Sequence, residues 1–347
     1  MIRVGVLGAT GYAGEELVRL LCQHPQVTIA ALCSHSAAGE EFCSLYPGYR
    51  GIPGLPALCE LDVSRIARDC DIAFVSLPHG ASKEVVPALY QAGLKVVDFS
   101  GDFRYDDPAV YEKWYKDTHS CPELLQKSVY GLPELHRAAI QNAQLIGNPG
   151  CFTTCSILAL APAVKLGLIQ PMSIIIDAKS GATGAGKGLA EQTHFCELDG
   201  SMKAYKVGTH RHTSEIEQEL GKLNGAPIAL SFTPHLLPIK RGILATSYAT
   251  YTGKLDAAGL YAAYREFYQD EPFVTICPPG QLPELKHVVG SNRIAIGMVL
   301  DQRVGRLVLV SCIDNLIKGA AGQAVQNMNL LFGLEETMGL SMPPWNL

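Results

Sequence analysis

The sequence predicts two domains, an α/β domain built on a parallel sheet and an α+β domain with a mixed or antiparallel sheet. A chain of 347 residues is longer than one hydrophobic core of ordinary size requires. Up to residue 148, short apolar runs alternate with helical patterns, an order typical of parallel strands joined by crossover helices. Beyond that point the strands are separated by longer polar or Gly/Pro segments, which favours a mixed or antiparallel sheet.

The expected elements follow in chain order. An apolar strand, Ile2 to Leu7, runs into a glycine-rich turn and then a helix, EELVRLLCQH. Further strands lie in VTIAALCS, CDIAFVSLP and LKVVDFSG, with helical patterns such as ASKEVVPALYQAG between them. In the second domain we expect strands in SIIIDAKSG, APIALSFTPHL, GILATSYATYT and RLVLVSCID, followed by a helical run, NLIKGAAGQAVQNMNLLFGL. We place the domains at 1–148 and 149–314.

Composition excludes several classes of function. The net charge of -5 is spread along the chain without a basic block, so nucleic acid is not an expected partner. No stretch reaches the ~18 to 20 apolar residues of a membrane span, and the N-terminus has no secretory pattern, so we expect a cytoplasmic protein without a membrane partner. Eleven irregularly spaced cysteines fit reduced thiols better than a disulfide framework or a zinc site.

The turn after the first strand resembles a dinucleotide-binding loop. Gly8, Gly11 and Gly14 have the spacing G-x-x-G-x-x-G, with Thr10 and Tyr12 between them. Glycines there let the backbone approach a pyrophosphate that rests on the N-terminus of the next helix. Such turns also occur for packing reasons alone. The preceding strand and following helix nevertheless predict a Rossmann-like, dinucleotide-binding first domain.

The end of the second strand indicates which dinucleotide is bound. An NAD enzyme usually carries an acidic residue there for the ribose 2′-hydroxyl. This chain has Ser34, His35 and Ser36, and no acidic residue until Glu40. We therefore predict NADP; the alternative is an ordinary loop of small polar residues.

Cys151 follows an Asn148-Pro149-Gly150 turn and precedes a helix-like apolar run. A thiol at a helix N-terminus meets N–H groups that have no partner within the helix, and these stabilise a thiolate. Cys155 lies one helical turn on and should face the core. The alternative for Cys151, one cysteine among eleven, is a buried structural thiol.

Two histidines could donate or accept the proton in a reaction that begins with the Cys151 thiolate. His210 and His212 stand just ahead of a predicted helix, and in an extended segment both would lie on one face. The alternative is a pair of surface histidines at a helix entry, with Thr213 as the cap. Together with Cys151 and a nicotinamide cofactor, they suit a thioester or thiohemiacetal mechanism in which phosphate can take the acyl group.

Motifs along nearly the whole chain resemble the N-acetyl-γ-glutamyl-phosphate reductases. They are GATGYAGEELVRLL, DFSGDFR, VYGLPEL, GNPGCFTT, SGATGAGKG, HRHTSEIEQEL, HLLPIKRGILAT and DNLIKGAAGQAVQNMN. The first is shared with many dinucleotide enzymes, and the cysteine motif with the sister aspartate-semialdehyde dehydrogenases. The resemblance implies NADPH-dependent reduction of N-acetyl-γ-glutamyl phosphate to the semialdehyde in arginine biosynthesis, a homo-oligomer (dimer or tetramer), and a C-terminal helix, 315–347, that returns to the first domain.

The resemblance also implies roles for single residues. Cys151 is the nucleophile and His212 the acid/base, with His210 as the alternative. Arg104 binds the substrate phosphate, or else forms a surface ion pair with Asp102 or Asp106.

Further residues are expected near the cofactor or the substrate carboxylate. By resemblance, Gly181, Gly184 and Gly186 form a loop near the nicotinamide, and Asn315 contacts its amide or caps the last helix. Arg211, Lys240 and Arg241 are candidates for the substrate carboxylate. The chain departs from the family with Ser214 in place of proline and Lys187 in place of arginine.

Other interpretations remain open from the sequence. An aspartate-semialdehyde dehydrogenase acting on β-aspartyl phosphate would use the same nucleophile and cofactor. A non-catalytic NADP-binding sensor would need the glycine turn but not Cys151 and the histidines together. A cysteine hydrolase would give the dinucleotide fold no role.

Overall fold

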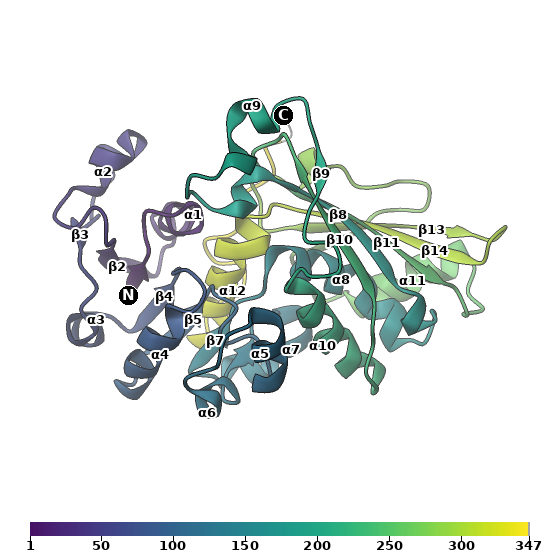
Figure 1. Ribbon diagram of the computed structural model, residues 1–347, viewed down its shortest axis with the longest axis horizontal. Helices are drawn as coiled ribbons and strands as arrows, with labels where there is room; N and C mark the ends of the chain where they lie inside the picture. The colour runs from purple at the N-terminus through teal and green to yellow at the C-terminus, as the bar shows by residue number, and fades with distance from the viewer. Residues whose placement is uncertain (346–347) are drawn as a thin grey trace. The chain divides into compact units, whose positions relative to one another are not determined.

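The computed structural model describes residues 1–345, and the chain divides into two compact units (Figure 1). The first comprises Met1–Pro149 and Ala320–Ser341, and the second Gly150–Gly319 with the described residues from Met342 onward. Residues 346–347 of the predicted C-terminal segment lie outside the described residues. Within 1–345, no helix is both long and apolar enough to cross a membrane.

The first unit contains a seven-stranded sheet in which all neighbouring strands are parallel. The strands, in sheet order, are β3 (Leu58–Cys59), β2 (Val27–Cys33), β1 (Ile2–Leu7), β4 (Ile72–Val75), β5 (Lys95–Asp98), β7 (Leu145–Gly147) and β6 (Val129–Tyr130). This order and the parallel pairing confirm the predicted α/β, Rossmann-like fold.

Helices alternate with these strands, as parallel crossovers require. They are α1 (Tyr12–Leu21), α2 (Phe42–Leu45), α3 (Val63–Asp69), α4 (Ser82–Gln91), α5 (Pro108–Tyr115), α6 (Pro122–Leu125), α7 (Pro133–Gln141) and, from the end of the chain, α12 (Gly322–Leu331). Because helices cover both faces of the sheet, β4 is buried throughout, and its sequence IAFV is continuously apolar.

Helix α12 packs within the first unit against α1, α7 and β5 (Figure 1). Its polar side chains are buried, and their amide N–H groups donate to neighbouring segments. The amides of Gln323 and Asn327 both donate to the Gly131 carbonyl at 2.9 Å, and Asn327 also donates to the side chain of Asn148 at 3.1 Å. These bonds tie α12 to the loop before α7 and to the turn that leads to Cys151.

The second unit contains a seven-stranded mixed sheet, as predicted. Its strands, in sheet order, are β12 (Val274–Ile276), β13 (Ile294–Asp301), β14 (Arg306–Ile313), β11 (Ile243–Thr250), β8 (Ile175–Gly181), β10 (Ser231–Leu237) and β9 (Lys203–Ala204). β12 pairs with β13, and β8 with β10, in parallel; the other pairs are antiparallel. Its helices are α8 (Cys151–Lys165), α9 (Phe195–Leu198), α10 (His212–Asn224) and α11 (Ala257–Phe267).

Helix α8 is the central element of this unit. Every residue from Phe152 to Val164 is buried, because α8 packs against β11, β14 and α10. Cys155 is fully buried, its Sγ lies 3.2 Å from the Ser311 Oγ, and burial raises the pKa of the thiol to about 12. The prediction that Cys155 faces the core is confirmed.

A buried histidine makes the stability of the first unit depend on pH. The Nε2 of His24 lies 3.0 Å from the Asn329 Oδ1, and its Nδ1 accepts the Gln26 N–H at 3.2 Å, so the ring is neutral. Burial lowers the pKa of His24. The folded state thus binds fewer protons than the unfolded state, where the pKa is about 6.5, and stability present above that pH is lost as pH falls below it.

We therefore expect the urea midpoint of unfolding to decrease between pH 7.5 and 5.5. The His24→Gln variant keeps a hydrogen-bond donor to Asn329 but does not titrate, so its midpoint should decrease less over the same interval. Equal decreases in both proteins would contradict this origin of the pH dependence.

Candidate active site

Cys151 is the first residue of α8, directly after the turn that the sequence singles out. The turn is held within the first unit, where the Asn148 Nδ2 donates to the Ala320 carbonyl at 3.1 Å. Gly150 precedes the helix in an extended conformation and has no side chain to cap it. The half-buried Cys151 therefore lies at the positive end of a long helix, where a thiolate is stabilised.

Two glycines leave the space that this arrangement needs. A Cβ on Gly319 would lie 2.7 Å from the Cβ of Cys151. A Cβ on Gly150 would lie 2.3 Å from the Nε2 of His212. The backbone of Gly319 therefore packs directly on the nucleophile, and His212 packs on the residue immediately before it.

Glu215 connects His212 to the start of α8. It is completely buried, its Oε2 accepts the Gly150 N–H at 3.4 Å, and its Oε1 lies 3.8 Å from the His212 Nε2. A carboxylate at this distance stabilises an imidazolium. Glu215 is not among the residues predicted from the sequence, although the spacing His-x-x-Glu places both side chains on one face of a helix.

The backbone around the histidines differs from the extended segment that was predicted. Arg211 is helical (φ -59°, ψ -32°), and His212 is the first residue of α10. The two rings still come together, with centroids 4.7 Å apart, because the turn brings His210 back over the helix start. The proposed alternative of Thr213 as the cap is wrong, since Thr213 lies within α10.

His210 acts as a hydrogen-bond acceptor at the start of α10. Its Nδ1 accepts the backbone N–H of His212 at 3.2 Å. Burial, and then the neighbouring charge of His212, lower the pKa of His210 to about 2. His210 is therefore neutral at physiological pH, and it packs edge-on against Phe152 and Phe232.

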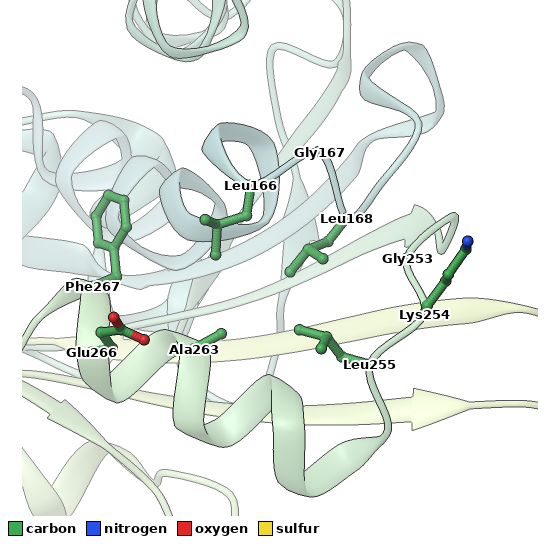
Figure 2. Close-up of a pocket in the computed structure, with 9 residues that line it drawn as sticks. All are labelled: Leu166, Gly167, Leu168, Gly253, Lys254, Leu255, Ala263, Glu266 and Phe267. Carbon is green, nitrogen blue, oxygen red and sulfur yellow. The ribbon is translucent and has the colours of Figure 1, made fainter.

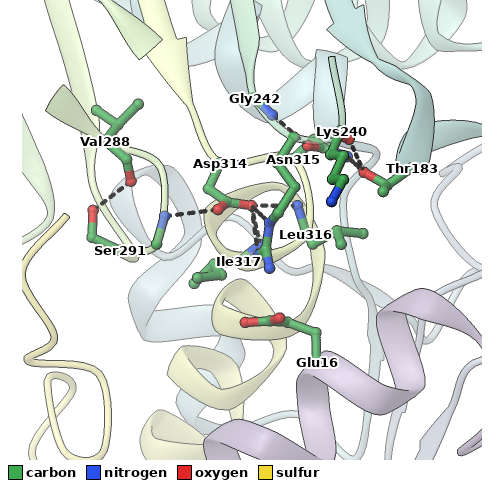
Figure 3. A network of polar contacts seen from close by, with 12 residues as sticks. Glu16, Thr183, Lys240, Gly242, Val288, Ser291, Asp314, Asn315, Leu316 and Ile317 are labelled. Atoms are coloured by element: carbon green, nitrogen blue, oxygen red, sulfur yellow. Dashed lines mark hydrogen bonds and ion pairs between the residues drawn. The ribbon is translucent and has the colours of Figure 1, made fainter. Parts of the chain in front are cut away.

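The structure brings Asn315 to the loop after β8. Its Oδ1 accepts the Gly242 N–H at 2.7 Å, and its Nδ2 donates to the Thr183 Oγ1 at 3.0 Å (Figure 3). A Cβ on Gly184 would lie 3.8 Å from the Asn315 Nδ2, whereas the Gly181 backbone packs on Lys240 at the end of β8. Gly184 and Gly186 are exposed.

Asp314, rather than Asn315, caps the last helical segment. Its Oδ1 accepts the N–H groups of Leu316 and Ile317 at 2.9 and 3.2 Å, so the capping alternative for Asn315 is wrong (Figure 3). A π-helical turn, Ile317–Ala321, follows, in which the Gly319 N–H donates to the Asp314 carbonyl at 2.9 Å. Asp314 thus fixes the turn that presses Gly319 onto Cys151.

The three carboxylate candidates differ in their surroundings. The Arg241 Nη2 donates to the fully buried Asp314 at 2.9 Å, so this guanidinium already neutralises a carboxylate of the chain. Lys240 is exposed and Arg211 half-buried.

Replacing Gly319 with alanine tests the packing around the nucleophile. The added methyl group must displace Cys151, because both its Cα and its Cβ lie within 3.2 Å of the new atom. We expect kcat to fall about 100-fold, the size of effect that a misplaced reacting group produces. Gly188→Ala is the matched control, since a Cβ at Gly188 meets nothing within 4 Å. A folded Gly319→Ala protein with full turnover would contradict this role.

The glycine turn of the first unit fits a pyrophosphate group. Gly8 has φ +85°, and a Cβ on it would lie 2.2 Å from the Ser76 carbonyl oxygen. A Cβ on Gly14 would lie 2.2 Å from the Gly8 carbonyl oxygen, and Gly11 leaves α1 without a capping side chain. No capping side chain therefore occupies the N-terminus of α1, which leaves its N–H groups available to an anion. Tyr12, the first residue of α1, is exposed.

The predicted 2′-phosphate loop lies next to this turn. The Thr10 Oγ1 and the Ser34 Oγ lie 3.0 Å apart. Ser34 is buried, whereas His35 and Ser36 are exposed. Hydroxyl and imidazole groups are therefore gathered at the end of β2, where the dinucleotide ribose binds in this fold.

Arg104 lies in the first unit and is buried, with 6% of its surface exposed. Its Nη2 donates to the Phe99 carbonyl at 2.6 Å. Asp102 is also buried and accepts the Gly80 N–H and the Tyr111 hydroxyl. Arg104 is therefore not a surface residue, and its ion pair with Asp102 or Asp106 stays a prediction.

A groove of about 680 Å³ is lined by the turn that follows the C-terminal end of α8 (Figure 2), whereas Cys151 is the first residue of that helix. It is bordered by the turn 166–168, the loop 253–255 and one face of α11, and Lys254 and Glu266 are its charged groups. A helix of 15 residues spans about 20 Å, so this groove is separate from the cysteine. Among residues 1–345, no group of three or more His, Cys, Asp or Glu side chains could hold a metal ion.

Comparison with known protein families identifies the family to which this chain belongs. Residues 3–143 match the semialdehyde dehydrogenase NAD-binding domain, and residues 151–315 match the semialdehyde dehydrogenase dimerisation domain. The chain belongs to the semialdehyde dehydrogenase family. Members of this family are oxidoreductases with a dinucleotide-binding domain, so the chain is an enzyme rather than a passive sensor.

Relatives within the semialdehyde dehydrogenases narrow the assignment. N-acetyl-gamma-glutamyl-phosphate reductase of Acetivibrio thermocellus is 53% identical over 347 residues, all of both chains. The enzyme of the same name from Desulforudis audaxviator is 50% identical over 343 residues, 99% of each chain. These matches confirm the resemblance drawn from the motifs and favour it over the aspartate-semialdehyde alternative.

Solved structures of semialdehyde dehydrogenases share the fold. Aspartate semialdehyde dehydrogenase II complexed with ASA from Vibrio cholerae superimposes with a TM-score of 0.72 at 19% identity, covering 96% of this chain and 98% of the other. Aspartate semialdehyde dehydrogenase with NADP from Candida albicans gives a TM-score of 0.69 at 16% identity, with coverages of 96% and 98%. Both confirm the predicted architecture.

Proposed function

We propose that this semialdehyde dehydrogenase reduces N-acetyl-γ-glutamyl phosphate to N-acetylglutamate 5-semialdehyde, with NADPH as the reductant and phosphate as the leaving group. The observation that carries the proposal is the placement of Cys151 at the start of α8, packed against Gly319, in a chain about half identical to enzymes named for this reaction. A nucleophile so placed suits attack on an acyl phosphate.

Cys151 performs the covalent step. Its thiolate attacks the acyl carbon, the bond to the phosphate oxygen breaks, and a thioester forms. When bound, NADPH supplies the hydride that reduces this thioester. The resulting thiohemiacetal breaks into the aldehyde and the Cys151 thiolate, which the positive end of α8 stabilises.

His212 manages the proton of the acyl oxygen in this scheme. It donates the proton as the thioester is reduced and takes it back as the thiohemiacetal breaks. Glu215 supports this role because a carboxylate 3.8 Å from the Nε2 stabilises the charged imidazole. His210 is neutral and holds the backbone of His212 in place.

The cofactor is NADPH rather than NADH in this proposal. Gly8, Gly11 and Gly14 would hold the pyrophosphate, and Ser34, His35 and Ser36 the 2′-phosphate. The cofactor-binding domain would comprise 1–148 together with 315–347, and the catalytic domain 149–314; Asn315, Gly181 and Gly184 would face the nicotinamide. Equal Michaelis constants for NADPH and NADH would contradict the NADP assignment.

Arg104 would bind the phosphate of the acyl phosphate. A buried guanidinium suits a phosphate because it offers two parallel N–H donors. Arg104→Ala should raise the Michaelis constant for phosphate in the reverse reaction and leave that for NADP unchanged. An unchanged constant for phosphate would assign Arg104 a structural role only.

The reverse reaction tests the whole proposal. The enzyme is mixed with NADP, phosphate and either N-acetylglutamate semialdehyde or aspartate semialdehyde. Formation of NADPH is then measured by its absorbance. Phosphate-dependent signal with the acetylated aldehyde alone supports the proposal. Preference for aspartate semialdehyde would keep the mechanism and change the substrate, and no signal with either would reject the reaction.

We also propose a homo-oligomer, a dimer or tetramer, in the cytoplasm. The match of 151–315 to a dimerisation domain supports it. So do the large apolar side chains of Leu189, Phe195, Met202 and Val207 on the surface of the second unit. Light scattering at micromolar concentration tests this proposal. A measured mass equal to that of one chain would contradict it.

A further inference from the structure

Two cysteines of the first unit stand side by side at the ends of neighbouring strands. Cys33 is the last residue of β2 and Cys59 the last residue of β3, and the parallel register pairs them directly. Their Sγ atoms lie 3.6 Å apart. Adjacent strands lie about 4.8 Å apart, within the range of about 4.4–6.8 Å that a disulfide spans between Cα atoms. A bond between the two sulfurs therefore needs only a small movement.

The backbone of this pair supports the predicted dinucleotide loop. The Cys33 carbonyl accepts the N–H groups of Gly8 and Ala9, both at 3.0 Å. The Cys59 carbonyl accepts the N–H of Ser34 at 3.0 Å. A movement of either strand end therefore reaches the glycine turn and the first residue of the 2′-phosphate loop.

The two thiols differ in their access to solvent. Cys33 is buried, with 3% of its surface exposed, and burial raises the pKa of its thiol. Cys59 is half-buried. An oxidant from solvent should therefore meet Cys59 first, and Cys33 is placed to react with the product.

We propose that Cys33 and Cys59 form a redox-sensitive modification site, a reversible disulfide whose closure weakens binding of the dinucleotide. The proposal rests on the assignment of the Ser34 loop to NADP. The oxidant is a peroxide. No comparison or motif assigns a role to either cysteine.

The chemistry proceeds in two steps. The Cys59 thiolate attacks one peroxide oxygen and breaks the O–O bond, which gives a sulfenic acid and, after protonation of the leaving oxygen, water. The Cys33 sulfur then attacks the Cys59 sulfur; the S–S bond forms, the S–O bond breaks, and the hydroxyl leaves as water with the Cys33 proton. Two thiols lose two electrons in total, and the peroxide is reduced to two waters. A small dithiol reverses the reaction by exchange.

Closure changes the side-chain torsions of both cysteines, and any shift of their backbone passes to the N–H groups that their carbonyls accept. The sulfurs move from 3.6 Å apart to a bond of about 2.0 Å, and a shift of the Cys59 backbone carries the Ser34 N–H with it. We expect the Kd for NADPH to rise about tenfold, the size of losing one hydrogen bond to a charged phosphate.

The experiment uses the full chain with Cys151→Ser, so that oxidation of the nucleophile does not interfere, and it measures binding instead of turnover. The protein is treated with hydrogen peroxide, and the Kd for NADPH is measured by nucleotide fluorescence before treatment, after it, and after reduction with dithiothreitol. Trypsin cleaves at Arg50 between the two cysteines, and fragmentation of the cross-linked peptide pair distinguishes Cys33 from Cys22 and Cys43, which lie in the same tryptic peptide.

Two variants complete the test. Cys59→Ser should bind NADPH normally and become insensitive to peroxide, whereas Cys43→Ser, which removes another half-buried thiol, should remain sensitive. The proposal is overturned if no Cys33–Cys59 peptide forms while other thiols oxidise, or if the peptide forms without a change in Kd. If the reduced protein binds no NADPH, the cofactor assignment fails instead, and the cross-linked peptide alone still decides whether the pair closes.

Discussion

Replacing Cys151 with serine should lower kcat by at least about 10⁴-fold, because no thiolate remains to form the thioester. A serine hydroxyl at a helix start stays protonated at neutral pH, whereas the helix end favours the cysteine thiolate. The measurement is NADPH oxidation with the acyl phosphate, or its reverse. Binding of NADPH, measured separately, should be unchanged.

Cys196→Ser is the matched control for this experiment, because Cys196 is an exposed thiol in the same unit. Its variant should keep full activity. Iodoacetamide offers an independent check, since Cys151 should be labelled far faster than the other ten cysteines. Uniform, slow labelling of all thiols would contradict an activated nucleophile.

The second large effect is expected at His212. His212→Asn removes the group that donates and accepts the acyl-oxygen proton, and general acid–base catalysis contributes about 10²–10⁴-fold. We expect kcat to fall by that factor. The limb of the kcat–pH profile that reports ionisation of the imidazole should disappear. The measurement is the reverse reaction between pH 6 and 9.

His210→Asn separates the two histidines. The Oδ1 of asparagine can still accept the His212 N–H, which His210 accepts at 3.2 Å, so turnover should stay within about tenfold of the wild type. The pH profile should keep its shape, because His210 does not titrate near neutral pH. A larger loss in His210→Asn than in His212→Asn would reverse the assignment of roles.

Local sequence patterns were enough to predict the elements that carry the chemistry. The first strand has the predicted bounds, Ile2–Leu7, because an apolar run ends there at a glycine that adopts φ +85°. The helix at Cys151 was predicted from the turn before it and the apolar residues after it, and α8 begins at that residue. In strongly patterned segments of this kind, residues close together in the sequence determine the secondary structure.

The features that sequence did not predict depend on contacts between distant segments. The strands β3 and β6 have two residues each, too few to show any periodicity. Gly319 meets Cys151 only because Asp314 caps a π-helical turn, and nothing in the sequence distinguishes that turn from an ordinary helix start. The turn at Arg211 was mistaken for extended chain because it precedes a helix without a capping side chain.

The position of α12 affects how the first unit folds during synthesis on the ribosome. Residues 320–341 complete the first unit, yet the ribosome releases them only after the whole of residues 150–319. At a synthesis rate of roughly 5–20 residues per second, the nascent first unit waits roughly 10 to 30 s for the helix that packs against β5 and α7. During that interval the apolar surface that α12 will cover is available to chaperones, whereas the second unit is already contiguous and free to fold.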